Sequence, residues 1–203
     1  MTGARGVRVR RVLLRAPTPA DALPFLALVQ ASAELHHPWV VAPETPVAFR
    51  AYLARAACEH DLFPAHVCRL VCRASDGAVV GAANLNNVVW GGLRGASLGY
   101  YAFAPYAGEG YVRDGVAELL THGFRHAGLH RVEAAVQPDN ARSRALLAAL
   151  GFRHEGDSPR YMKFGGRWRD HERWAITEDE WRPERARGPR RRPRDAPGGA
   201  SAE

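Results

Sequence analysis

A short loop that contains two glycines, Gly108 and Gly110, most constrains what this chain can fold into. An apolar, strand-like run over residues 96–104 precedes the loop, and apolar residues at helical spacing follow it. Glycine adopts backbone conformations that other residues avoid, and the first amide groups of a helix lack partners within the helix. These amides and the helix dipole attract anions. The loop therefore predicts a phosphate-binding turn between a strand and a helix.

Two other glycine-rich phosphate motifs do not match this loop. A dinucleotide-binding fingerprint needs a third small residue where Arg113 stands, and a Walker loop needs a Gly-Lys-Ser/Thr sequence, which is absent. Taken alone, the loop is equally consistent with a plain turn that binds nothing.

The hydrophobic pattern predicts an α/β domain in which strands and helices alternate. The expected strands span residues 7–15, 65–73, 78–85, 96–104, 130–137, 152–164 and 168–176. Asp76-Gly77 and Gly165-Gly166 predict hairpin turns. The helices are expected to begin at Thr18-Pro19, at Thr45-Pro46, after the glycine loop, and at Asp139 or Asn140.

Composition bears on the cellular location and on possible metal or membrane binding. The three cysteines, Cys58, Cys68 and Cys72, give no disulfide framework, so a reducing, cytoplasmic location is expected. Their spacing relative to the nearby histidines matches no zinc finger, and no metal site is predicted. The chain shows neither a signal-peptide pattern nor a run of 18 apolar residues, so no membrane association is expected.

The net charge of +7 comes largely from the last residues of the chain. Residues 182–203 are rich in Arg, Pro and Gly and contain almost no bulky apolar side chain. We expect a folded domain over residues 1–181 and a disordered tail over 182–203. Nucleic-acid binding is expected only through this basic tail, and a solvated tail without a partner is the plainer interpretation.

A second motif follows about thirty residues after the loop. Asn140 and Ser143 open a predicted helix that closes at Gly151-Phe152. Together with the glycine loop, this segment resembles the GNAT family of acyl-CoA N-acyltransferases. That family's loop has the pattern Gln/Arg-x-x-Gly-x-Gly/Ala. Pro105 stands at the Gln/Arg position, which removes one side-chain contact but leaves the backbone cradle.

Further fragments match in the same order along residues 7–181. They are His37-Pro38-Trp39, Gly99-Tyr100 and residues 166–171. Within the family, the match is closest to the ribosomal-protein alanine N-acetyltransferases of the RimJ/RimL type. The resemblance implies a mixed, mostly antiparallel central sheet flanked by helices.

The resemblance also implies the activity. Such a protein binds acetyl-CoA as cosubstrate, needs no metal, and transfers the acetyl group directly to a primary amine. The expected acceptor is a protein N-terminal α-amine, of a ribosomal protein in particular. The alternatives are a small amine such as a polyamine, an amino acid or an aminoglycoside, or a non-catalytic acyl-CoA-binding or RNA-associated protein.

The matched motifs imply the candidate catalytic, acetyl-CoA-binding and acceptor-binding residues. Ser143 is the candidate donor to the coenzyme sulfur, Asn140 a helix cap that also contacts the pantetheine or the amine, and Glu133 a candidate base acting through water. Each also has a plain structural interpretation, such as a bond from Glu133 to Arg131. The expected acetyl-CoA contacts are Tyr101, Ala102, Phe103, Gly108, Glu109, Gly110, Tyr111, Val112, Arg113, Asn140 and Ser143. The expected acceptor contacts are His37, Trp39 and His171.

Overall fold

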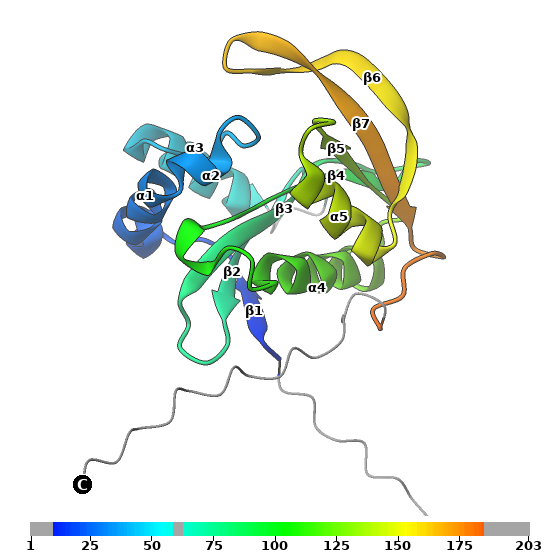
Figure 1. The fold of residues 1–203 in the computed structure, drawn as a ribbon. Helices are drawn as coiled ribbons and strands as arrows, with labels where there is room; N and C mark the ends of the chain where they lie inside the picture. Colours follow the sequence, from blue (N-terminus) through cyan, green and yellow to red (C-terminus); the bar gives the residue numbers. More distant parts are fainter. Residues whose placement is uncertain (1–9, 59–62, 185–203) are drawn as a thin grey trace, which may run out of the picture.

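Seven strands lie side by side in one sheet, in the order β1-β2-β3-β4-β5-β7-β6 (Figure 1). The structure is a computed structural model that describes residues 10–58 and 63–184. The strands are β1 Val12–Arg15, β2 Val67–Arg73, β3 Val79–Val89, β4 Gly95–Ala102, β5 Arg131–Val136, β6 Arg153–Phe164 and β7 Arg167–Thr177. The α-helices are α1 Ala22–Ala31, α2 Ala33–His36, α3 Pro46–Ala57, α4 Tyr111–Arg125 and α5 Ala141–Leu150.

The pairing of β4 with β5 sets the shape of the sheet's centre. These two strands are parallel, whereas the other described pairs are antiparallel. Their pairing runs only from Gly95 opposite Arg131 to Ser97 opposite Glu133. Beyond that point β4 continues along β3 while β5 continues along β7, so the two strands separate. The mixed, mostly antiparallel sheet expected from the sequence is confirmed.

Helices cover both faces of the sheet, and β2 shows how its two faces are used. Val71 packs in the hydrophobic cluster that contains α4, while its neighbours Leu70 and Cys72 pack in the cluster with α1 and α3. This is the alternation that a strand imposes on successive side chains. The apolar stripe predicted for α4 is buried through Val116, Leu119 and Leu120, among other residues.

Local sequence signals account for the helix ends. Thr18 and Asp21 form a capping box at the 3-10 turn Pro19–Asp21, which leads into α1. The Thr45 hydroxyl accepts the Ala48 amide at the start of α3. Gly151 ends α5 in the left-handed conformation with φ 89°. These three predictions from the sequence are confirmed.

Other boundaries differ from the expectation. β1 begins at Val12, and the expected start at residue 7 lies outside the described residues. β3 extends to Val89 rather than ending at residue 85, because it pairs with the full length of β4. α2 is a further short helix that was not predicted. Most of the expected tail, residues 185–203, lies outside the described part of the chain.

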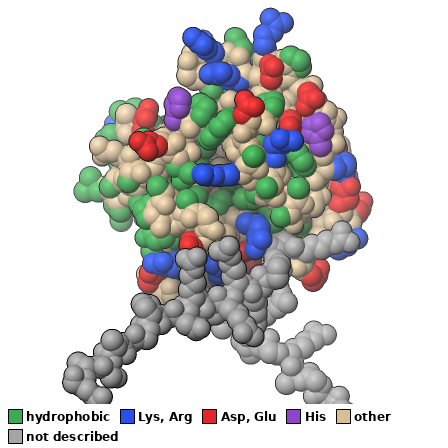
Figure 2. All heavy atoms as spheres, in the orientation of Figure 1, with side chains coloured by type: hydrophobic (Ala, Val, Ile, Leu, Met, Phe, Trp, Pro, Cys, Tyr) green, Lys and Arg blue, Asp and Glu red, His purple; other side chains and the backbone are tan. Residues whose placement is uncertain are grey.

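An arm of two strands extends past the end of β5. β5 pairs with β7 only from Glu172 to Thr177, whereas β6 and β7 stay paired to the Gly165-Gly166 turn. The arm curls away from the sheet (Figure 1), and Lys and Arg side chains gather on it (Figure 2). Trp168 on this arm is 61% exposed. Across the described residues, none of the helices combines the length and apolar character that crossing a membrane requires.

Close contact between α4 and the sheet depends on one glycine. A Cβ atom added at Gly115 would lie 2.6 and 2.8 Å from the methyl groups of Val71, which is fully buried. We predict that Gly115→Ala lowers the free energy of unfolding by about 1–3 kcal/mol, although alanine favours helix, because a packed core resists added volume. Urea unfolding measures this. Gly92→Ala is the control, since nothing lies within 4 Å of its added Cβ, and a loss of similar size there would contradict the packing argument.

Candidate active site

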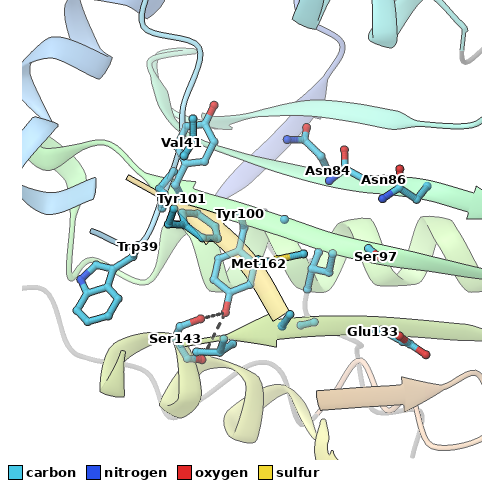
Figure 3. A pocket seen from close by; sticks show the side chains of 18 of the residues that line it. Trp39, Val41, Asn84, Asn86, Ser97, Tyr100, Tyr101, Glu133, Ser143 and Met162 are labelled. Carbon is cyan, nitrogen blue, oxygen red and sulfur yellow. Dashed lines mark hydrogen bonds between the residues drawn. The ribbon is translucent and has the colours of Figure 1, made fainter. Parts of the chain in front are cut away.

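A cavity of about 430 Å³ opens where β4 and β5 separate (Figure 3). Side chains from both faces of the sheet line it. Tyr100 and Ser143 approach from the face covered by α4 and α5, while Asn84, Tyr101 and Glu133 lie on the other face. The cavity therefore passes through the split in the sheet. Two molecules can reach each other there from opposite sides.

The Ser143 hydroxyl is hydrogen-bonded to the hydroxyl of a tyrosine on β4. The Tyr100 hydroxyl lies 2.6 Å from Ser143 Oγ and 3.4 Å from the Ser143 carbonyl oxygen. Figure 3 shows Tyr100 reaching from β4 to the first turn of α5. Burial raises the pKa of Tyr100 to about 12, so its phenol stays protonated near neutral pH.

Asn140 holds the first turn of α5 in place. Its side-chain Oδ1 accepts the Ser143 amide at 3.1 Å, as expected of an N-cap. Both Asn140 and Ser143 line the cavity. The cap therefore fixes the backbone of Ser143 beside the cavity.

The backbone amides of β4 that face the split only partly coincide with the expected contact residues Tyr101, Ala102 and Phe103. The Phe103 N–H donates to the Val80 carbonyl at 3.0 Å, so it is not free for a ligand. Because strand residues alternate, the Tyr101 N–H also faces β3, and the N–H groups of Tyr100 and Ala102 face the split. Of the three expected contact residues, Ala102 thus presents its N–H to the split, whereas Tyr101 and Phe103 do not.

A histidine takes the place of the missing strand neighbour. His36, which is buried at the end of α2, lies with Nε2 2.8 Å from the Ala102 carbonyl oxygen. Burial lowers the pKa of His36, which favours the neutral ring with its proton on Nε2 for this bond. His36 thus satisfies a backbone oxygen that β5 leaves unpaired.

Glu133 is held by two arginines. Its carboxylate lies 2.8 Å from Arg131 Nε and 2.6 Å from an Arg173 guanidinium nitrogen. Burial alone raises the pKa of Glu133, but the hydrogen bonds and charges of the two arginines outweigh it and hold the pKa below its usual value. A carboxylate in this state is a poor base. In Figure 3 the Glu133 side chain also lies away from Ser143, at another part of β5.

The face of the cavity opposite α5 is mostly polar and uncharged. Asn84 Oδ1 accepts the Tyr52 hydroxyl at 2.9 Å. The Tyr101 hydroxyl is buried without a hydrogen-bond partner among the described residues. Burial raises the pKa of Tyr101 well above its usual value, so this group stays neutral. An unsatisfied buried hydroxyl beside a cavity is suited to meet a polar group of a ligand.

The glycine loop has the geometry expected of an anion site. Gly108 and Gly110 have φ values of 82° and 81°, in the left-handed region. The first bond within α4 joins the Asp114 amide to the Gly110 carbonyl, so the amides of residues 111–113 precede the helical ladder. Arg11 also reaches the loop and donates to the Glu109 carbonyl at 3.0 Å.

The expected acceptor residues are only partly brought together. Trp39 lines the cavity, whereas His37 and His171 are not among the described residues that line it. His171 is buried on β7, and its ring lies against Tyr161 and Phe164, which do line the cavity.

Several lining residues were missed from the sequence. Tyr52 and Arg55 fall within residues 35–63, a segment expected to help build the acceptor pocket, but were not singled out. Also missed were Asn84, Asn86 and the side-chain role of Tyr100. The sequence carries one signal for the last of these, because Gly99-Tyr100 already belongs to the matched fragments. The others lie on elements that no motif marks.

The comparisons with known proteins agree with this geometry. The sequence pattern of the acetyltransferase (GNAT) domain family matches residues 11–153. The chain belongs to this family. The split between two parallel strands, with a glycine loop on one face, is therefore the candidate active site of an acetyltransferase domain.

Individual relatives show which members of the GNAT family this chain resembles. The chain is 36% identical over 107 residues to the [Ribosomal protein uS5]-alanine N-acetyltransferase of Escherichia coli, a match that covers 53% of this chain and 55% of that protein. The chain thus spans about half the length of the curated relatives that it matches. Mycobacterium smegmatis RimJ, solved in complex with CoA-disulfide, is 32% identical with a TM-score of 0.78, covering 86% of this chain and 87% of the other. The RimJ/RimL-like resemblance read from the motifs is confirmed.

A third relative shares the fold alone. The spermidine N-acetyltransferase from Vibrio cholerae, in complex with CoA and spermine, has a TM-score of 0.69 at 19% identity and covers 84% of this chain and 97% of the other. The common architecture therefore does not by itself distinguish a peptide acceptor from a polyamine.

The cap on α5 provides a test of the site's framework. We predict that Asn140→Ala lowers the free energy of unfolding by about 0.5–2 kcal/mol, because the Ser143 amide loses its acceptor. Denaturant unfolding measures the change. Asn140→Asp keeps an oxygen at the cap and serves as the matched control. Equal losses in the two variants would show that the cap hydrogen bond contributes nothing.

Proposed function

We propose that this protein is an N-acetyltransferase that moves the acetyl group of acetyl-CoA directly to the N-terminal α-amine of a protein, a ribosomal protein in particular. The observation that carries the proposal is the cavity through the split sheet, which has Ser143 on the face of the glycine loop and a separate polar surface on the other face. The relatives named for this activity support the same acceptor class. The proposed location is the cytoplasm, because the proposed acceptor is a ribosomal protein.

The donor side is the face with α4 and α5. The amides from Gly108 to Arg113 would hold the pyrophosphate, since a helix N-terminus favours anions. Arg11 and Arg113 add positive charge beside the loop. This leaves the acetyl end of the cosubstrate to enter the split next to Ser143.

Groups of this chain can stabilise each negative charge that develops during acyl transfer. As the amine attacks the thioester carbonyl, its oxygen gains negative charge, and the free amides of Tyr100 and Ala102 face the place where this happens. As the carbon–sulfur bond breaks, negative charge forms on sulfur. The Ser143 hydroxyl and the N-terminus of α5 stabilise it there.

The amine needs little help from a base. A protein α-amine has a pKa near 8, so a sizeable fraction is already neutral at pH 7. Glu133, with its lowered pKa and two arginine partners, contributes to the shape and charge of the cavity rather than to proton removal.

The lining favours a peptide over a polyamine. Of the described residues that line the cavity, those with charged side chains are Arg55, Arg173 and Glu133, and Glu133 is already paired. Burial, followed by the charge of Arg55, lowers the pKa of His66, so that side chain is neutral as well. A polycation would meet two arginines and no free acid. A peptide N-terminus carries one amine followed by amide groups, which match the asparagines and tyrosines.

An acceptor panel tests the proposal. With acetyl-CoA, a short peptide with a free N-terminal alanine should have a kcat/KM at least about tenfold above that of spermidine, a difference of about 1.4 kcal/mol. The same peptide with a blocked N-terminus and an internal lysine is the control for amine position. A preference for spermidine would overturn the acceptor, and binding of acetyl-CoA without transfer to any amine would favour a non-catalytic acyl-CoA-binding protein.

The glycine loop gives a separate test of the donor side. Acetyl-CoA in excess should raise the Tm of the wild-type protein, because a ligand of the native state stabilises it. Gly108→Asp places a negative charge in the cradle and should abolish that rise. Gly91→Asp is the matched control, because Gly91 has a similar φ of 74° and equally open surroundings but lies in another loop. A full rise in Gly108→Asp would remove the loop from the binding site.

A further inference from the structure

Ser143 can stabilise the departing thiolate of CoA only if its hydroxyl hydrogen points toward the sulfur. A serine hydroxyl rotates freely and has one hydrogen to give. The Asn140 cap holds the Ser143 backbone but does not contact the hydroxyl. The described partner of Ser143 Oγ is the Tyr100 hydroxyl, 2.6 Å away.

Either hydroxyl can be the donor at this distance, and the two directions leave different hydrogens for a ligand. If Ser143 donated to Tyr100, the serine hydrogen would be used up, and the phenol hydrogen would be left with the Ser143 carbonyl at 3.4 Å, a distance at the limit for an O–H donor. If Tyr100 donates to Oγ, the 2.6 Å contact is a good hydrogen bond and the serine hydrogen is free for the cavity. Only the second arrangement leaves a hydroxyl hydrogen for a ligand in the cavity, because the first uses both hydrogens on contacts within the protein. The protonated phenol has the hydrogen that the second arrangement needs.

We infer that Tyr100 is the positioning residue for Ser143: its hydroxyl donates to Ser143 Oγ and thereby directs the serine O–H to the sulfur of the acyl donor. This inference rests on the proposed function. Tyr100 also polarises the serine hydroxyl, since a hydroxyl that accepts a hydrogen bond becomes a stronger donor.

The step balances without a change of protonation at either residue. The amine nitrogen forms a bond to the carbonyl carbon, the carbon–sulfur bond breaks, and its electron pair stays on sulfur. The proton that the amine nitrogen loses balances the one that the free thiol finally carries. A serine hydroxyl is a far weaker acid than a thiol, so Ser143 stabilises the thiolate by a hydrogen bond rather than by giving up its proton.

A double-mutant cycle separates this role from a merely structural one. Tyr100→Phe should lower kcat for the alanine peptide by about 2- to 13-fold, the range for loss of one neutral hydrogen bond, with the KM for acetyl-CoA within about twofold. In a Ser143→Ala background the same change should have almost no further effect on kcat. Tyr106→Phe, which removes a phenol hydroxyl away from the cavity lining, should leave kcat unchanged.

A second readout does not depend on turnover. The thiol of bound CoA should have a lower pKa on the wild-type protein than on Tyr100→Phe, by about 0.4 to 1 unit, because the directed serine hydrogen favours the thiolate. Ultraviolet absorbance of the thiolate against pH measures it. Ser143→Ala should raise this pKa at least as much, and Tyr106→Phe should not move it.

The outcomes distinguish the inference from the proposed function. If the wild-type protein transfers no acetyl group to any amine, the proposed function fails, and the thiol pKa still decides the role of Tyr100. If transfer occurs but Tyr100→Phe keeps the wild-type kcat and thiol pKa, the inference is wrong. Equal losses from Tyr100→Phe with and without Ser143 would also overturn it, because the tyrosine would then act independently of the serine.

Discussion

The end of pairing between β4 and β5 is the constraint on which the rest of the site depends. Parallel strands that diverge after Ser97 and Glu133 leave backbone groups without partners in the middle of a domain. Such groups are costly unless something satisfies them. A cavity open to ligands on both faces is one solution, and His36 provides another for the Ala102 carbonyl. The position of the proposed catalytic groups follows from where the strands part.

Charge is arranged differently on the two sides of this opening. On the proposed donor side, the glycine loop offers an anion the helix amides and positive end of α4, with Arg11 and Arg113 nearby, both paired with Asp114. Asp114 also lies there, and burial raises the pKa of its carboxyl despite the nearby Arg11 and Arg113. On the acceptor side, Glu133 is neutralised by its neighbours and the other groups are mainly amides and phenols. A single neutral amine attached to a peptide matches this surface.

The parts of the fold that the sequence predicted are those with a local cause. Strand alternation, the caps at Thr18 and Thr45, and the glycine at residue 151 all act within a few residues. The contacts that were missed join distant segments. Tyr100 and Ser143 are 43 positions apart, and His36 and Ala102 are 66 apart. Which residues meet across such distances depends on strand register, and no local pattern encodes it. The direction of the Phe103 amide likewise depends on its pairing with β3.

The bond between His36 and the Ala102 carbonyl has a consequence for how an extended chain can enter. A strand with free amides and carbonyls normally invites another strand to pair along its whole length. Here the far end of that inward-facing edge is already capped by a side chain, and the near end is closed by β5 at Ser97. The stretch around Leu98 and Tyr100 stays unpaired, and the Ala102 N–H beside the capped carbonyl also faces the split. An extended chain that pairs with this edge can therefore make main-chain contacts only along this short stretch.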